Sequence, residues 1–181
     1  MNLITFDAFQ GKWSDDIHRE WTTHLVANGK DKKKVLRTKK LMDKHFPDAK
    51  VSYYKKLIKT LTLPDPDDRH VLAVAIKSHA SFIITDNLKD FPKKHLPVNI
   101  QAISIDNFLL EISQKSPLKV IEAIKYHRNT LKNPPYSVDE YIEARKNENL
   151  KGLWSFLKST KKPSSVTSIL KLNRNWHFSR F

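Results

Sequence analysis

The chain has 181 residues, of which 33 are Lys or Arg and 19 are Asp or Glu, giving a formal net charge of +14. No run of 18 apolar residues occurs, which argues against a transmembrane helix, and the absence of cysteine excludes disulfides, thiol catalysis and cysteine zinc sites. The N-terminal residues lack the features of a secretory signal, so we expect a cytoplasmic protein without a membrane partner. So basic a surface favours nucleic acid, an acidic membrane or an acidic protein, although solvated lysine-rich faces would give the same composition.

The first third of the chain predicts two helices. Ser14 is a good N-cap, followed by two aspartates in the first turn and by apolar residues at helical spacing. A second helix is expected from Lys32 to about Phe46, and it is dense in lysine. The segment 49–60 is ambiguous, with a short strand around Val51 as one interpretation.

The middle of the chain predicts alternating helices and strands. Asp65 is interpreted as a helix cap with Pro66 in the first helical position, followed by apolar residues at helical spacing. The segments 81–85 and 100–105 read as strands, and the first of these is typical of a buried parallel strand. This alternation predicts an α/β core with a parallel sheet.

From Asp106 onward the pattern is helical, with helices expected over 106–114, 117–131, 138–147 and 150–159. Ser137 and Glu140 have capping-box spacing, and Tyr136 with Tyr141 fits the accompanying hydrophobic staple. We therefore expect an α/β domain over 1–115, a helical extension over 116–160 and a basic, poorly ordered tail over 161–181.

Acidic residues gather at three places against this basic background. Glu20 shares a helix face with apolar residues, although a partly exposed helical glutamate paired to a base would look the same. Asp68 begins a buried helical stripe and can face a cleft beside the sheet. Thr85, Asn87 and Asp90 follow the carboxyl end of a buried strand, where open α/β sheets bind ligands, although an Asx turn leading to a surface helix is the alternative.

Oxygen ligands that converge on one cleft suit a hard divalent cation such as Mg²⁺ or Mn²⁺. Such an ion can activate water and neutralise charge on a phosphodiester, whereas bare carboxylates would repel a polyanion. A basic protein with an acidic pocket is therefore typical of a metal-dependent nuclease. The histidines have no metal-ligand spacing and are interpreted as ordinary surface or core residues.

Three segments, KWSDDIHREW, LTLPDPDDRHVLAVAIKSHASFIITDNLKDFP and, more weakly, NPPYSVDEYIEA, resemble the PIN-domain family over roughly residues 3–158. The chain is most similar to the VapC-like bacterial toxin branch with a C-terminal helical extension. The resemblance implies a three-layer α/β/α sandwich around a parallel sheet, and Mg²⁺- or Mn²⁺-dependent cleavage of RNA. It also implies a cognate antitoxin protein as partner and, in common with relatives, a homodimer.

The resemblance also implies roles for individual residues. Glu20, Asp68 and Asp90 would hold the metal, and Thr85 and Asn87 would orient ligands or water as further catalytic residues. Asn87 stands where many relatives have aspartate. The family normally begins with a strand that ends in a further metal-binding aspartate, and here Met1 falls inside the helix expected after it. Three explanations stay open: a misassigned start, a truncated and inactive relative, or completion by another chain.

Three functions are carried forward from the sequence. The first is an endoribonuclease toxin of a type II toxin–antitoxin system, with the basic segment 30–44 tracking the RNA backbone. The second is a catalytically impaired relative that binds RNA or antitoxin without cleavage. The third is a nuclease or accessory protein that acts on DNA.

Overall fold

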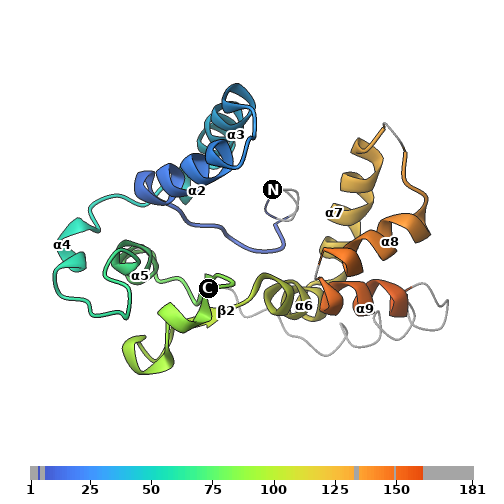
Figure 1. Cartoon of the computed structure of the whole chain (residues 1–181). Helices are drawn as coiled ribbons and strands as arrows, with labels where there is room; N and C mark the ends of the chain where they lie inside the picture. The colour runs from blue at the N-terminus through green and yellow to red at the C-terminus, as the bar shows by residue number, and fades with distance from the viewer. Residues whose placement is uncertain (1–3, 5–6, 133–134, 149, 161–181) are drawn as a thin grey trace. The chain divides into compact units, whose positions relative to one another are not determined.

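A computed structural model describes residues 4, 7–132, 135–148 and 150–160, and the tail expected at 161–181 lies outside them. The described chain forms two compact units, one of which is Gln10–Ser104, while the other contains the residues from Ile105 onward and the described part of the segment before Gln10. Figure 1 labels their elements. The first unit contains α2 (Asp15–Ala27), α3 (Lys32–His45), η1 (Pro47–Ala49), α4 (Lys55–Ile58), α5 (Arg69–Lys77), β1 (Phe82–Ile84), η2 (Leu88–Asp90), η3 (Lys93–His95) and β2 (Gln101–Ile103). The second unit contains α6 (Ile105–Lys115), α7 (Pro117–Thr130), α8 (Val138–Asn147) and α9 (Lys151–Thr160).

The sheet of the described residues consists of β1 and β2, which run parallel with Ile83 opposite Ala102. This arrangement confirms the predicted α/β class. Ile83 is buried in a core that includes Leu72 of α5 and Ile100, which precedes β2. The prediction of a fully buried strand is wrong at Ile84, whose 41% exposure shows that core packing covers only the Ile83 side.

Helix α5 begins later than the sequence predicts. Asp65 does not cap it, because its Oδ1 accepts a hydrogen bond of 2.8 Å from the backbone N–H of Asp67 and closes a turn. The helix starts at Arg69, with Asp68 in the N-cap position. The two prolines and the aspartate turn therefore keep residues 65–67 outside the helix, and the Asp68 side chain makes no capping hydrogen bond.

Helices α2 and α3 are joined by a buried polar network around His18. Trp21 donates from its indole N–H to Nδ1 of His18 over 2.8 Å, which leaves the ring hydrogen on Nε2. That Nε2 donates to Oδ1 of Asp43 over 2.9 Å. Trp13 donates to the same oxygen over 3.1 Å, and Lys39 donates to the other carboxylate oxygen over 3.1 Å. The network satisfies a histidine that has no solvent exposure.

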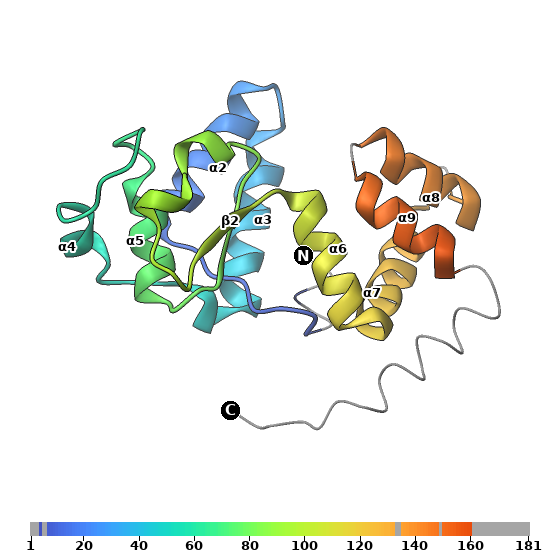
Figure 2. The ribbon, with the colours of Figure 1, turned by 90° about the horizontal axis from the view of Figure 1, so that it is seen from below.

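The second unit is organised by a contact between α6 and α9. Figure 2 shows these two helices together with α7 and α8. The carboxylate of Asp106, at the start of α6, accepts backbone N–H bonds of 2.8–2.9 Å from Gly152 and of 3.2 Å from Leu153. Asp106 thus caps the first turn of a helix 46 residues away. Gly152 permits the approach, since a Cβ atom there would lie 3.2 Å from both Asp106 oxygens.

The start of α8 confirms two local predictions. Ser137 and Glu140 form the reciprocal hydrogen bonds of a capping box. The rings of Tyr136 and Tyr141 meet edge to face, with centroids 6.5 Å apart, as expected for the staple. Among the described residues, no helix combines the length and apolar character needed to cross a bilayer.

Replacement of Asp43 by asparagine should destabilise the protein most above pH 4. Burial alone would raise the pKa of Asp43, but hydrogen bonds from Lys39, His18 and Trp13 outweigh it and lower the pKa to about 2. Because this folded-state pKa lies below the unfolded value, the stabilisation is present above the unfolded pKa and disappears as pH falls through the folded one. We expect Asp43→Asn to cost up to about 2 kcal/mol at pH 7. Urea unfolding measured from pH 7 to pH 2.5 should show that the free energies of unfolding of the wild type and Asp43→Asn converge. A difference between the two proteins that stays constant with pH would contradict this explanation.

Replacement of Asp106 by alanine should loosen the start of α9. Loss of a capping carboxylate leaves two backbone N–H groups without their acceptor, and we expect a cost of about 1 kcal/mol. Hydrogen exchange at the amides of Gly152 and Leu153 should accelerate, and denaturant unfolding should report the loss of stability. Asp106→Asn retains an acceptor oxygen and serves as the control with a smaller effect. Unchanged exchange at both amides in the alanine variant would show that the cap is dispensable.

Candidate metal centre

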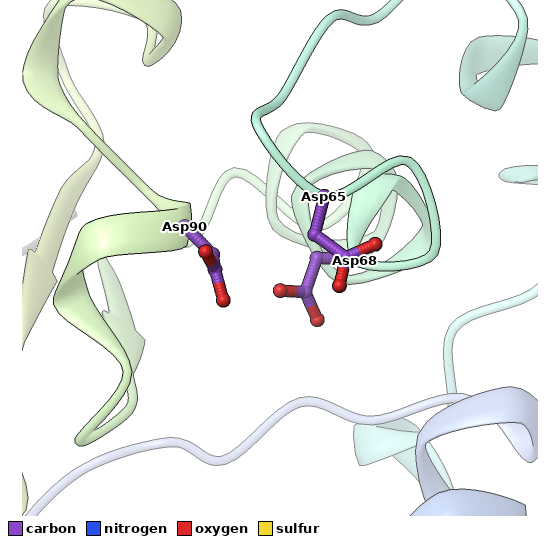
Figure 3. A group of neighbouring side chains, drawn as sticks. All are labelled: Asp65, Asp68 and Asp90. Carbon is purple, nitrogen blue, oxygen red and sulfur yellow. The ribbon is translucent and has the colours of Figure 1, made fainter.

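Three aspartates of the first unit bring their carboxylates together. One carboxylate oxygen from each of Asp65, Asp68 and Asp90 lies within 4.8 Å of the other two. Figure 3 shows the three side chains entering the same space, with Asp65 and Asp68 on the segment that leads into α5 and Asp90 on η2. We call these three residues the aspartate group. Its members come from the start of one helix and from the segment after β1.

Local structure holds Asp90 in place. Thr85 Oγ1 accepts a 3.0 Å hydrogen bond from the backbone N–H of Asn87 and bends the chain directly after β1. Asn87 then donates from its side-chain amide to Oδ2 of Asp90, the last residue of η2. The threonine and the asparagine therefore act in series to orient the carboxylate.

The electrostatics of the aspartate group oppose its assembly. Burial raises the pKa of Asp68 above its ordinary value, and the negative charges of Asp65, Asp90 and Glu20 raise it further. The nearby His70 acts in the opposite direction. Asp68 thus lies in a field of like charge that a bound cation would relieve.

Glu20 borders the aspartate group without belonging to it. Its side chain is 54% exposed, and Oε2 lies 3.2 Å from Nε2 of His70, which is within ion-pair distance, while Nε2 makes no hydrogen bond in the described residues. The buried His70 ring is fixed at its other nitrogen, where Nδ1 lies 2.7 Å from the carbonyl oxygen of Asp67. An α2 residue is thereby held beside the segment that carries Asp67 and Asp68.

The structure distributes the sequence-predicted residues over three positions. Asp68 and Asp90 lie in the aspartate group, Thr85 and Asn87 support Asp90, and Glu20 lies at the border.

Asp65 was missed as a candidate because acids before a helix are usually caps. Asp65 and Asp68 are three residues apart at a turn before a buried helix, and this spacing is the signal that could have identified Asp65. His70 was also missed as a neighbour of Glu20, since the sequence gives no sign that α2 and α5 meet at these residues.

The aspartate group fits a hard divalent cation. Carboxylate oxygens are the ligands that Mg²⁺ and Mn²⁺ prefer, and three of them lie close enough together to share one ion. The raised pKa of Asp68 shows that the metal-free arrangement concentrates negative charge. The group therefore concentrates negative charge in a chain whose formal net charge is +14.

Comparison with known proteins gives two consecutive family matches. The PIN domain model matches residues 1–89, and the VapC50 C-terminal domain model matches residues 105–157. The second match begins at the residue that opens α6 and the second unit. No solved structure is significantly similar to the chain.

A curated relative supports the same assignment over a shorter stretch. The chain is 51% identical over 45 residues to a Mycobacterium tuberculosis (strain ATCC 25618 / H37Rv) protein named "Putative ribonuclease VapC50". The aligned segment spans 24% of this chain and 27% of the relative's own length. Taken with the two family matches, it shows that the chain belongs to the PIN-domain family, in its VapC-like branch.

Proposed function

We propose that this protein is a metal-dependent endoribonuclease and the toxin of a type II toxin–antitoxin system. The observation that carries the proposal is the aspartate group, three convergent carboxylates in a PIN-domain chain. The matched relative is named as a ribonuclease, which favours RNA as the substrate. The proposal includes action in the cytoplasm, silencing by a cognate antitoxin, and a homodimer as the assembly.

In this proposal Asp65, Asp68 and Asp90 hold Mg²⁺ or Mn²⁺, with Glu20 as an outer acid. The bound ion would supply water of lowered pKa and neutralise charge on the phosphodiester. Asn87 holds the Asp90 carboxylate in position through its side-chain amide. Glu20 lies beside the metal position and is suited to accept a proton or a water hydrogen bond there, because more than half of its side chain is open to solvent.

The charge of the chain supports a polyanionic substrate. Helix α3 carries exposed lysines along its outer face, and its Asp43 is engaged by Lys39 and the His18 network. A positive surface attracts the RNA backbone over distances of about a Debye length, roughly 8 Å at physiological salt. The carboxylates of the aspartate group would repel the same backbone without a metal. Binding and cleavage therefore place opposite requirements on charge, which a divalent ion reconciles.

The cleavage test compares the wild type with two aspartate variants that differ in position. With Mn²⁺ or Mg²⁺ and a mixed RNA substrate, we expect Asp68→Asn to reduce cutting at least about a hundredfold, as loss of a metal ligand does. Asp86→Asn is the matched control, because Asp86 is an exposed neighbour of Asn87 outside the aspartate group. EDTA should stop cleavage by the wild type. If the folded wild type binds RNA but does not cut it, the result would favour a catalytically impaired relative that only binds. If it prefers duplex DNA, the result would favour a protein that acts on DNA.

Stability should respond to Asp68→Asn in opposite ways with and without metal. In EDTA the variant should be more stable than the wild type, because it removes a charge from a group of like charges. Because the folded-state pKa of Asp68 is raised, protonation of Asp68 favours the folded wild type. The difference in stability between the variant and the wild type in EDTA should therefore become smaller as pH falls from 7 toward 4.

With Mn²⁺ the order of stability should reverse. An ion present at 100 times its dissociation constant stabilises the wild type by about 2.7 kcal/mol, and the variant should lose most of this gain. Thermal unfolding with and without Mn²⁺ measures both effects, and Asp86→Asn should behave as the wild type. If Mn²⁺ stabilises the wild type and Asp68→Asn equally, Asp68 is not a ligand of the metal.

A further inference from the structure

Tyr53 has an unusual combination of exposure and backbone conformation. Its side chain is 93% exposed, and its φ of 62° lies in the left-handed region. A bulky residue is rare in this region, because its Cβ crowds the following carbonyl oxygen, and glycine or asparagine is the usual occupant. A ring this exposed makes too few contacts to offset the free-energy cost of the left-handed backbone conformation. The protein therefore keeps a tyrosine where folding alone would favour glycine.

The neighbouring residue explains why Tyr53 points outward. Tyr54 is buried against Ala73 and Val74 of α5, and its hydroxyl donates to Oδ2 of Asp16. Hydrogen bonding to Tyr54 is the largest cause of the lowered pKa of Asp16, which also forms a 2.7 Å ion pair with Arg19. Tyr54 is thus fixed from two sides. Because consecutive side chains cannot both enter this core, the ring of Tyr53 is presented to solvent.

Three exposed lysines follow Tyr53 in sequence, two of them on α4 (Lys55–Ile58) and the third at its C-cap. The apolar residues of this helix, Leu57 and Ile58, pack toward α5, and Lys55, Lys56 and Lys59 are exposed. Lys55 acts on the charge of Asp16. For Lys56 and Lys59, no acidic group of the described residues lies within ion-pair distance. The segment therefore offers a flat aromatic ring beside positive charge that no carboxylate neutralises.

We propose that Tyr53, Lys56 and Lys59 form a binding surface for single-stranded RNA, in which a base stacks on the Tyr53 ring and the lysines contact phosphates. Aromatic rings next to basic groups are the means by which proteins hold single strands without reading sequence. A protein partner would require exposed apolar side chains near the ring, whereas the exposed residues that flank Tyr53 in sequence are Ser52, Lys55 and Lys56. This inference rests on the proposed function, because the ribonuclease activity is the reason for naming RNA as the ligand. It adds a substrate-holding surface in the same unit as the aspartate group.

The test measures binding of a fluorescein-labelled single-stranded RNA of about 10 nucleotides to the full chain, within the usual site size of such surfaces. Anisotropy is recorded in EDTA so that no cleavage occurs. Tyr53→Gly should weaken binding about tenfold, because one stacked base is lost. The same variant should raise the midpoint of thermal unfolding, since glycine adopts the left-handed conformation without a steric cost. Tyr53→Phe keeps the ring and should bind within about twofold of the wild type.

The lysines are tested through salt dependence. The Lys56→Ala and Lys59→Ala double variant should lower the slope of log affinity against log salt by about 1.4, at roughly 0.7 per phosphate contact on a single strand. Lys93→Ala with Lys94→Ala is the matched control, because this exposed pair lies on η3 rather than α4. An unchanged slope in the α4 variant, or an equal loss in both, would overturn the assignment of this surface.

The outcomes separate this proposal from the ribonuclease proposal. Tight RNA binding by Tyr53→Gly, with Mn²⁺-dependent cleavage intact, would overturn the Tyr53 surface and leave the nuclease standing. Ring-dependent RNA binding in a protein that never cuts RNA would keep the surface and reject the nuclease. A wild type that binds duplex DNA as tightly as single-stranded RNA at equal salt would also overturn the stacking surface, since paired bases do not present free faces.

Discussion

The candidate site depends on the backbone holding three carboxylates closer together than their charges favour. Asp65 and Asp68 are fixed by a turn at the start of α5, and Asp90 is fixed by the threonine and asparagine that follow β1. None of these carboxylates is neutralised by a lysine or arginine in the described residues, although the chain is strongly basic. In the described residues these three negative charges are therefore left uncompensated, which is the arrangement that the proposed metal site requires.

The same constraint applies to α2, which carries Glu20. Its Glu20 contacts His70 of α5, and the helix is held by side-chain links that include Tyr54 to Asp16 and His18 to Asp43. Each link joins a residue of high polarity to a partner that is at least partly buried, where an unpaired group would be costly. A flexible α2 would leave the position of Glu20 relative to the aspartate group undefined.

Much of this organisation was predictable, and the failures have physical causes. Periodicity identified α2, α3 and the four helices of the second unit because each has an apolar stripe or a local cap, such as Ser14 and Ser137. Asp68, Asn87 and Asp90 were found because they lie beside a buried helix or strand. Asp65 was misread because the same residue type serves as a cap and as a ligand. His70, Tyr53 and the cap from Asp106 to α9 depend on contacts or dihedral angles that no local pattern encodes.

The cap between Asp106 and Gly152 also has a consequence for the order of events during synthesis. The carboxylate emerges with α6, but its acceptor role is fulfilled only after 46 further residues have been added. Until then α6 lacks its partner α9, and the apolar surface of α6 that α9 would cover stays exposed. Contacts of such sequence separation form late, because the intervening chain must first be ordered. The second unit is therefore a structure that a growing chain completes from its far end, and an interruption of translation shortly before Gly152 would leave three helices with an unfinished core.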